Sequence, residues 1–262
     1  MTRSNACKSL VYAIFALALT AGVVTAGAEK DKKHTRGVTN VVLIHGAWAD
    51  GSSWSKVIPL LEAKGLHVVA VQLPLTSQAD DVATVQQAIA RLDGPLLLVA
   101  HSYGGSVMTQ AGNDPKVAGL VYVAAFAPDQ GESPFELATA HPTPALQQLL
   151  QDQFGFLKLT ETGIREDFAQ DLSDSEQTVL AAAQSPTAAA ALGAKVSAPA
   201  WRTKPSWFVI AARDRVVAPE LQAIFAERMN ATTFTLSSSH VAMLSQPYAV
   251  ASVIRRAARD VQ

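Results

Sequence analysis

The sequence predicts an α/β protein, with a mainly parallel sheet of about six strands flanked by helices and a helical insertion late in the chain. Three observations carry this prediction. Short runs of branched aliphatic residues recur along the chain, helical segments separate them, and this alternation stops between about residues 129 and 204. Strands separated by helical segments of roughly 10–15 residues are typical of βαβ units. The 262 residues are enough for one sizeable core.

Each strand is expected from a continuous apolar run, because a parallel strand is buried on both faces. The expected strands are residues 38–44, 66–71, 96–101, 117–125, 206–211 and 232–236.

The helices between these strands are expected from apolar residues at helical spacing and from their end signals. Gly65 ends the first helix and Pro219 begins a later one, the positions these residues favour. The expected helices cover about residues 54–64, 80–92, 104–112, 219–229 and 248–261.

Residues 129–204 are interpreted as a helical cap inserted into this pattern. No buried-strand pattern occurs there, and residues 147–156 and 174–183 have helical patterns. The alternative is that the segment continues the core. The strand pattern returns only at Ser206, which favours an insertion.

Residues 1–28 are expected to be a secretory signal peptide. Arg3 and Lys8 precede an apolar stretch, and Ala26-Gly27-Ala28 matches a cleavage site. An alternative cleavage site ends at Ala26, and an uncleaved anchor is a further alternative because the uncharged stretch is long enough to span a bilayer.

Cleavage would leave a domain of residues 29–262, secreted or periplasmic and not stably inserted in a membrane. It would also remove Cys7, the single cysteine of the sequence, so no disulfide is expected. The remaining 19 basic and 22 acidic side chains give a net charge of −3. Neither this charge nor the net charge of −1 for the whole sequence points to nucleic acid or to an anionic membrane surface as a partner.

A serine is expected at a sharp turn between the third strand and the following helix. The stretch Ala100-His101-Ser102-Tyr103-Gly104 places small residues two positions before and after Ser102. Such a turn pushes a hydroxyl out of the backbone, as in the pattern G-x-S-x-G, here with Ala in place of the first Gly. The alternative is an ordinary turn in which Ser102 caps the helix.

Ser102, Asp214 and His240 each follow the end of an expected strand. Because the carboxyl ends of parallel strands meet at one edge of a sheet, these side chains are expected to lie together. A hydroxyl needs an imidazole to take its proton and a carboxylate to orient that imidazole. Asp129, after the fourth strand, is an alternative carboxylate. The backbone N–H groups of Ala47 and Tyr103 are expected to bind an oxyanion.

These stretches resemble the α/β-hydrolase superfamily, and more narrowly its small serine esterase and hydroxynitrile-lyase-like branch. The resemblance implies an α/β-hydrolase fold in which Ser102 is the nucleophile, His240 the base and Asp214 the acid. It also implies hydrolysis of carboxylic esters through an acyl-enzyme, with no metal or other cofactor. The matching residues are 42–48, 100–105, 126–129, 212–215 and 239–241.

Two departures from related lyases favour ester hydrolysis. Those lyases have Thr where this chain has Gly46, and Lys where it has Val241. Lyase or perhydrolase-like activity and a non-catalytic small-molecule binder are the alternative functions.

Aromatic residues near the strand ends are candidates for an apolar substrate pocket, which would suit small to medium apolar esters. Trp48, Phe126 and Trp201 are the expected substrate contacts, with packing in the core as the alternative for each. His45 and His101 are interpreted as structural. No spacing of His, Asp and Glu suggests a metal site.

Overall fold

The computed structural model describes residues 37–261, in which six parallel strands form one sheet with the order β2-β1-β3-β4-β8-β9. All six strands expected from the sequence are confirmed. The expected signal peptide, residues 1–28, lies outside the described residues. The strands are β1 (Asn40–Ile44), β2 (His67–Ala70), β3 (Leu96–His101), β4 (Val117–Val123), β8 (Ser206–Ala211) and β9 (Thr232–Leu236).

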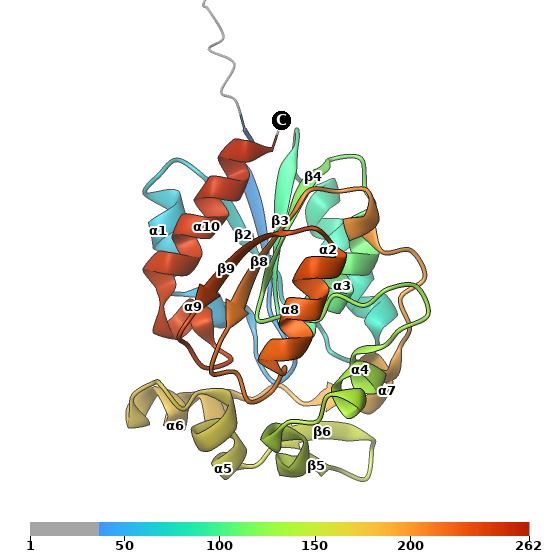
Figure 1. Cartoon of the computed structure of the whole chain (residues 1–262), viewed down its shortest axis with the longest axis vertical. Helices are drawn as coiled ribbons and strands as arrows, with labels where there is room; N and C mark the ends of the chain where they lie inside the picture. Colours follow the sequence, from blue (N-terminus) through green and yellow to red (C-terminus); the bar gives the residue numbers. More distant parts are fainter. Residues whose placement is uncertain (1–36, 262) are drawn as a thin grey trace, which may run out of the picture. The chain divides into compact units, whose positions relative to one another are not determined.

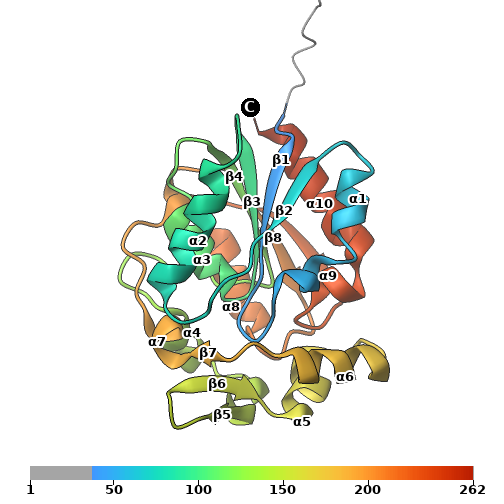
Figure 2. The same ribbon diagram turned by 180° about the vertical axis from the view of Figure 1, so that it is seen from behind.

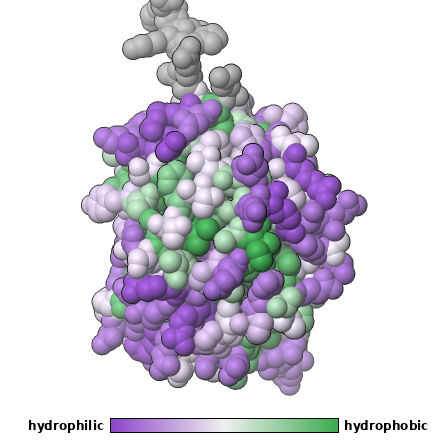
Figure 3. Space-filling view, in the orientation of Figure 1, coloured by the Kyte–Doolittle hydropathy of each residue, from purple (hydrophilic) through white to green (hydrophobic). Residues whose placement is uncertain are grey.

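Burial follows the position of each strand in the sheet. Every residue of β3 and β8 is buried, because these strands have neighbours on both sides and helices on both faces. The edge strand β9, with the sequence TTFTL, is partly exposed throughout. Figure 3 shows pale and green residues gathered in the middle of one face, near this edge, with hydrophilic residues around them.

Helices cover both faces of the sheet, as Figures 1 and 2 show. α1 (Ile58–Glu62) and α10 (Pro247–Asp260) lie on one face. The other face is covered by α2 (Gln78–Ala90), α3 (Gly104–Ala111) and α8 (Pro219–Arg228). The short α9 (Ala242–Ser245) precedes α10. None of the helices within residues 37–261 is both long enough and apolar enough to cross a bilayer.

The first expected helix, residues 54–64, is shorter than predicted. It is replaced by a 3₁₀ turn, η1 (Gly51–Trp54), and by α1, which has Pro59 in its first turn. Proline has no N–H and therefore favours the first turn of a helix over its interior, so the α-helix cannot extend back through this position.

Residues 129–204, which we call the cap, are not wholly helical, which corrects the sequence prediction. They contain a three-stranded antiparallel sheet in the order β5-β6-β7. Its strands are β5 (Leu149–Gln151), β6 (Phe156–Leu159) and β7 (Thr187–Ala188). The helical elements are α4 (Pro134–Ala140), η2 (Pro144–Gln148), α5 (Glu161–Gly163), η3 (Ile164–Phe168), α6 (Asp174–Ala183), α7 (Ala189–Gly193) and η4 (Ala200–Arg202).

The helix predicted for residues 147–156 is wrong, and turn chemistry explains why. The carboxylate of Asp152 accepts hydrogen bonds from the N–H groups of Phe154 and Phe156, both at 2.9 Å. Gly155 has a φ of +84°, which favours glycine. These features form a hairpin turn between β5 and β6, and local side-chain bonds of this kind compete with a helix. The helix predicted for residues 174–183 is confirmed as α6.

The cap lies across the carboxyl ends of the six parallel strands (Figure 1). Hydrogen bonds join it to the loops there. The backbone N–H of Trp48 donates to Thr187 Oγ1 at 3.1 Å, and the indole N–H of Trp48 donates to the Leu157 carbonyl at 3.0 Å. The cap therefore covers the edge of the sheet at which the candidate functional residues were expected.

Candidate active site

Ser102 occupies a strained turn between β3 and α3. Its φ is +53°, a left-handed conformation that is uncommon outside glycine. Neighbouring glycines make this close packing feasible. A Cβ on Gly46 would lie 2.6 Å from Ser102 Cβ, and one on Gly105 would lie 2.2 Å from the Phe126 carbonyl oxygen. The structure thus has the sharp turn that the sequence predicts, with Ala100 buried in place of the usual glycine.

His240 and Asp214 are joined by a buried hydrogen bond of 2.8 Å between Nδ1 and Oδ2. Both side chains are fully buried. The carboxylate also accepts hydrogen bonds from the N–H groups of Val216 and Val217 and from Gln222 Nε2. Because Nδ1 is occupied by the carboxylate, Nε2 is the ring nitrogen of His240 that can accept a proton.

Two aromatic rings fix the plane of the His240 imidazole. The His101 ring lies 4.5 Å away between centroids, and the Phe168 ring lies 5.1 Å away in an edge-on arrangement. His101 Nε2 is 3.0 Å from the His240 carbonyl oxygen, to which it donates. His240 is thus packed against the residue that directly precedes Ser102. Its Nε2 atom is buried and has no hydrogen-bond partner within residues 37–261.

Of the expected oxyanion donors, Ala47 lies in the loop after β1, and Tyr103 directly follows Ser102 at the start of α3. Both residues line the same cavity as Ser102. The Tyr103 hydroxyl donates to the buried Asp81 carboxylate at 2.7 Å, which holds the tyrosine side chain in one position. Burial raises the pKa of both Asp81 and Tyr103.

His45 has a structural position, in keeping with its interpretation from the sequence. Its Nε2 accepts a hydrogen bond of 2.9 Å from the Leu73 N–H, so its Nδ1 carries the proton and donates to the Gly46 carbonyl. Burial lowers the pKa of His45, which keeps the ring neutral. Both ring nitrogens are used, so His45 does not act as a base.

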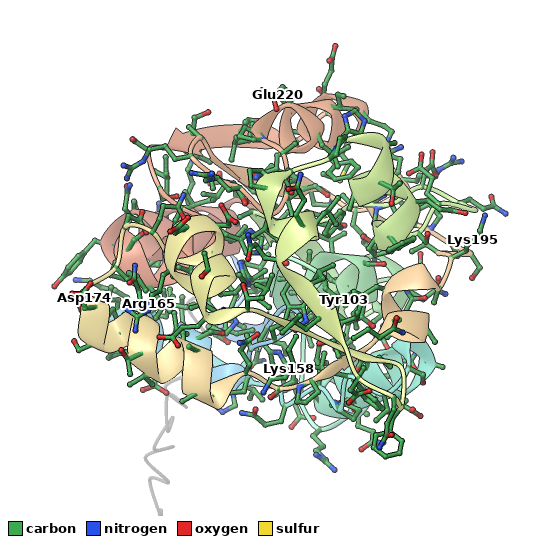
Figure 4. All side chains as sticks on the ribbon, turned by 90° about the horizontal axis from the view of Figure 1, so that it is seen from below. Tyr103, Lys158, Arg165, Asp174, Lys195 and Glu220 are labelled. Carbon is green, nitrogen blue, oxygen red and sulfur yellow. The ribbon has the colours of Figure 1, made fainter. Side chains whose placement is uncertain are left out.

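The cavity beside Ser102 is apolar and has a volume of about 40 Å³. Two of the expected substrate contacts, Trp48 and Phe126, line it. Residues of the cap form the rest of the cavity wall. Figure 4 looks onto the cap and shows Tyr103 near the centre of the view, with the labelled charged residues around it. The cap residues in its wall are Pro134, Phe135, Ala138, Ala145, Leu146, Leu149 and Leu192.

Trp201, the third expected substrate contact, does not line this cavity, and we correct that expectation. Its indole N–H donates to the Pro128 carbonyl at 3.0 Å, and the Arg228 guanidinium lies 5.3 Å from its ring centroid. Aromatic composition alone cannot distinguish a residue that lines a pocket from one that packs beside it.

Asp129, the alternative carboxylate, does not contact His240. It forms an ion pair with Arg202 in which the closest N–O distance is 2.7 Å. Within residues 37–261, His, Cys, Asp and Glu side chains form no group of three or more that could hold a metal ion.

Sequence reasoning missed Gln222, which is fully buried in α8 and donates to Asp214 Oδ2 at 2.8 Å. It also missed the contacts of Phe168 and Asp171 in the cap. The sequence feature that could have identified Gln222 is its position on the apolar side of the helix that follows the loop carrying Asp214.

Comparison with known proteins shows similarity across most of the chain. Residues 41–253 match the model of the alpha/beta hydrolase family. A pyrethroid hydrolase of Sphingobium wenxiniae is 36% identical over 110 residues, covering 37% of this chain and 39% of that protein. Methylesterase 2 of Arabidopsis thaliana is 35% identical over 122 residues, covering 40% of this chain and 44% of that protein. These matches thus span less than half the length of either relative.

The fold is also found in solved structures. The crystal structure of a pyrethroid hydrolase from Sphingobium faniae superposes with a TM-score of 0.74 at 24% identity, covering 84% of this chain and 97% of that chain. At this level of identity the likeness shows a shared fold.

Proposed function

Because the chain belongs to the alpha/beta hydrolase family, we propose that it is a serine hydrolase that cleaves carboxylic esters of small to medium apolar substrates. The observation that carries the proposal is the buried 2.8 Å bond between His240 and Asp214. The His240 ring packs against His101, the residue directly before Ser102, which is held in a left-handed turn. The names of the relatives, a pyrethroid hydrolase and a methylesterase, support ester hydrolysis.

In the proposed reaction, Ser102 Oγ attacks the ester carbonyl while His240 Nε2 takes the hydroxyl proton. Asp214 stays ionised and stabilises the imidazolium through Nδ1. The backbone N–H groups of Ala47 and Tyr103 donate to the oxyanion, and His240 returns the proton to the leaving alcohol. Water then attacks the acyl-enzyme, with His240 again as the base, and releases the acid.

The chemistry of the cavity supports an uncharged, apolar substrate group. None of the residues that line it carries a charged side chain, and most are aliphatic or aromatic. Burying an unpaired charge there would be costly.

The proposal is tested with Ser102→Ala and a p-nitrophenyl ester. We expect kcat to fall by about 10⁴-fold or more, because the nucleophile is lost. The circular dichroism spectrum should stay unchanged, and a fluorophosphonate should label the wild type but not the variant. Turnover by the variant close to that of the wild type would contradict the proposal.

We also propose that residues 1–28 are removed as a signal peptide and that the protein is secreted or periplasmic. The order of charged, apolar and small residues in this stretch supports it. Mass spectrometry of the protein from the producing cells should find a mature chain that begins at Glu29. An intact N-terminus in cell extracts, with no exported form, would contradict this proposal.

A further inference from the structure

One short segment of the cap, residues 167–171, contacts both loops that carry the candidate catalytic residues. It begins within η3, a π-helical turn in which the Ala169 N–H donates to the Ile164 carbonyl at 2.9 Å. Wide turns of this kind re-aim the side chains around them and are frequent at functional sites. Asp167, Phe168 and Ala169 of this segment are buried.

The loop after β9 carries His240, and we call it the histidine loop. It is held by Asp171. The Asp171 carboxylate accepts a hydrogen bond of 2.7 Å from the N–H of Ser239, the residue directly before His240. Arg213 lies 3.5 Å from the same carboxylate and also donates to the Ser237 carbonyl. The backbone position of His240 is therefore fixed by a side chain of the cap.

The loop after β8 carries Asp214, and we call it the acid loop. It is held by the same segment, residues 167–171. Gln170 Nε2 donates to the carbonyl of Arg213, directly before Asp214, at 2.7 Å. On the other side of Asp214, Arg215 forms an ion pair of 2.9 Å with the buried Asp167. The two residues that flank Asp214 are thus both joined to the cap.

Between these contacts, the Phe168 ring packs against the imidazole of His240 at 5.1 Å. Phe168 is buried, so its ring is itself held in place. One segment thus fixes the His240 backbone, the Asp214 backbone and the imidazole plane. All three contribute to the 2.8 Å bond between His240 Nδ1 and Asp214 Oδ2, together with the hydrogen bonds that orient the Asp214 carboxylate.

We propose that residues 167–171 are a positioning element for His240 and Asp214, with Asp171 as its main positioning residue. This inference rests on the proposed function. Without the segment, the acid and histidine loops would keep their bond to each other and the hydrogen bond from His101 to the His240 carbonyl. They would lose the contacts that hold Ser239, Arg213 and Arg215. A misplacement of about 1 Å in a reacting group can cost about 10²-fold in rate.

The test compares Asp171→Ala with Asp171→Asn on the same p-nitrophenyl ester. We expect Asp171→Ala to lower kcat by about 10- to 100-fold, with KM changed by less than about threefold. The rate of fluorophosphonate labelling at Ser102 should fall in parallel. Asp171→Asn should recover most of kcat, because an amide oxygen can still accept the Ser239 N–H.

Glu161→Ala is the matched control, because Glu161 is also a cap carboxylate but lies in an exposed ion pair with Arg165. It should leave kcat within about twofold of wild type. If Asp171→Ala does not fold, Gln170→Ala replaces it, since that change removes a single bond to the Arg213 carbonyl. The same loss of kcat at unchanged KM is expected.

The positioning role is overturned if Asp171→Ala, or its replacement, keeps wild-type kcat, or if the loss is confined to KM or thermal stability. An Asp171→Asn variant as slow as Asp171→Ala would overturn the assignment to this hydrogen bond. These outcomes differ from failure of the proposed function, in which wild type itself would neither hydrolyse the ester nor be labelled at Ser102.

Discussion

Asp214 accepts four hydrogen bonds, from two backbone N–H groups, from Gln222 and from His240. Gln222 is fixed in turn, since its Oε1 accepts the Ala211 N–H at 3.0 Å. The carboxylate is therefore oriented before any substrate binds. This pre-organisation is the property that a carboxylate needs in order to hold an imidazole in one tautomer.

Asp214→Asn tests this role. The asparagine amide would donate to His240 Nδ1, so the ring proton would move to Nε2, which could then no longer accept a proton from Ser102. We expect kcat to fall by about 10³- to 10⁴-fold in an ester assay. The matched control, Asp129→Asn, should change kcat by less than about threefold, because Asp129 binds Arg202 in a partly exposed pair. The reverse result, with Asp129→Asn inactive, would refute the assignment.

At the scale of residues, the sequence placed Ser102, Asp214 and His240 directly after strands, and the structure has them there; their catalytic roles stay predictions. Those positions were predictable because continuous apolar runs mark where parallel strands end. The buried position of Gln222 was not predictable, because a polar residue in a surface helix usually faces solvent. Trp201 was placed wrongly because its partners, Arg228 and the Pro128 carbonyl, come from distant segments.

At the scale of elements, the core was predictable and the cap was only partly so. The strands of the core carry their signal locally, in runs such as Leu96–His101. Strand β7 is two residues long and β5 three, too short for a periodic pattern. Their pairing depends on the turn at Asp152 and on contacts with Trp48, and neither of these is a periodic signal. The helix α6 was predictable because it begins with a capping box from Ser173 to Glu176.

Across residues 37–261, hydrogen bonds and ion pairs join the cap to the core at several places, and two of these places are loops that carry candidate site residues. One is the loop after β1, through Trp48. The other is formed by the acid and histidine loops, through Asp167 and Asp171. Removing one partner of a buried or partly buried hydrogen bond leaves the other unsatisfied, which lowers the free energy of unfolding. The stability of the domain and the geometry of the candidate site therefore depend on the same contacts.

His101 connects this stability to pH. Burial, followed by the nearby His240 imidazole, lowers the pKa of His101 well below its usual value of 6.5. Below about pH 6.5 the unfolded chain therefore binds a proton at His101 that the folded protein does not. The contribution of the neutral ring to stability is fully present above that pH, and it is lost as the pH falls toward the folded-state pKa.

His101→Gln removes this titration while its amide N–H can still donate to the His240 carbonyl. Urea unfolding at several pH values between 8 and 5 would measure the free energy of unfolding of both proteins. The difference at pH 8 gives the cost of repacking alone. As the pH falls below about 6.5, we expect wild type to lose stability faster, by up to about 1.4 kcal/mol per pH unit for the one proton. Parallel curves over this range would mean that His101 takes up its proton equally in the folded and the unfolded protein, and would contradict the buried neutral imidazole beside His240.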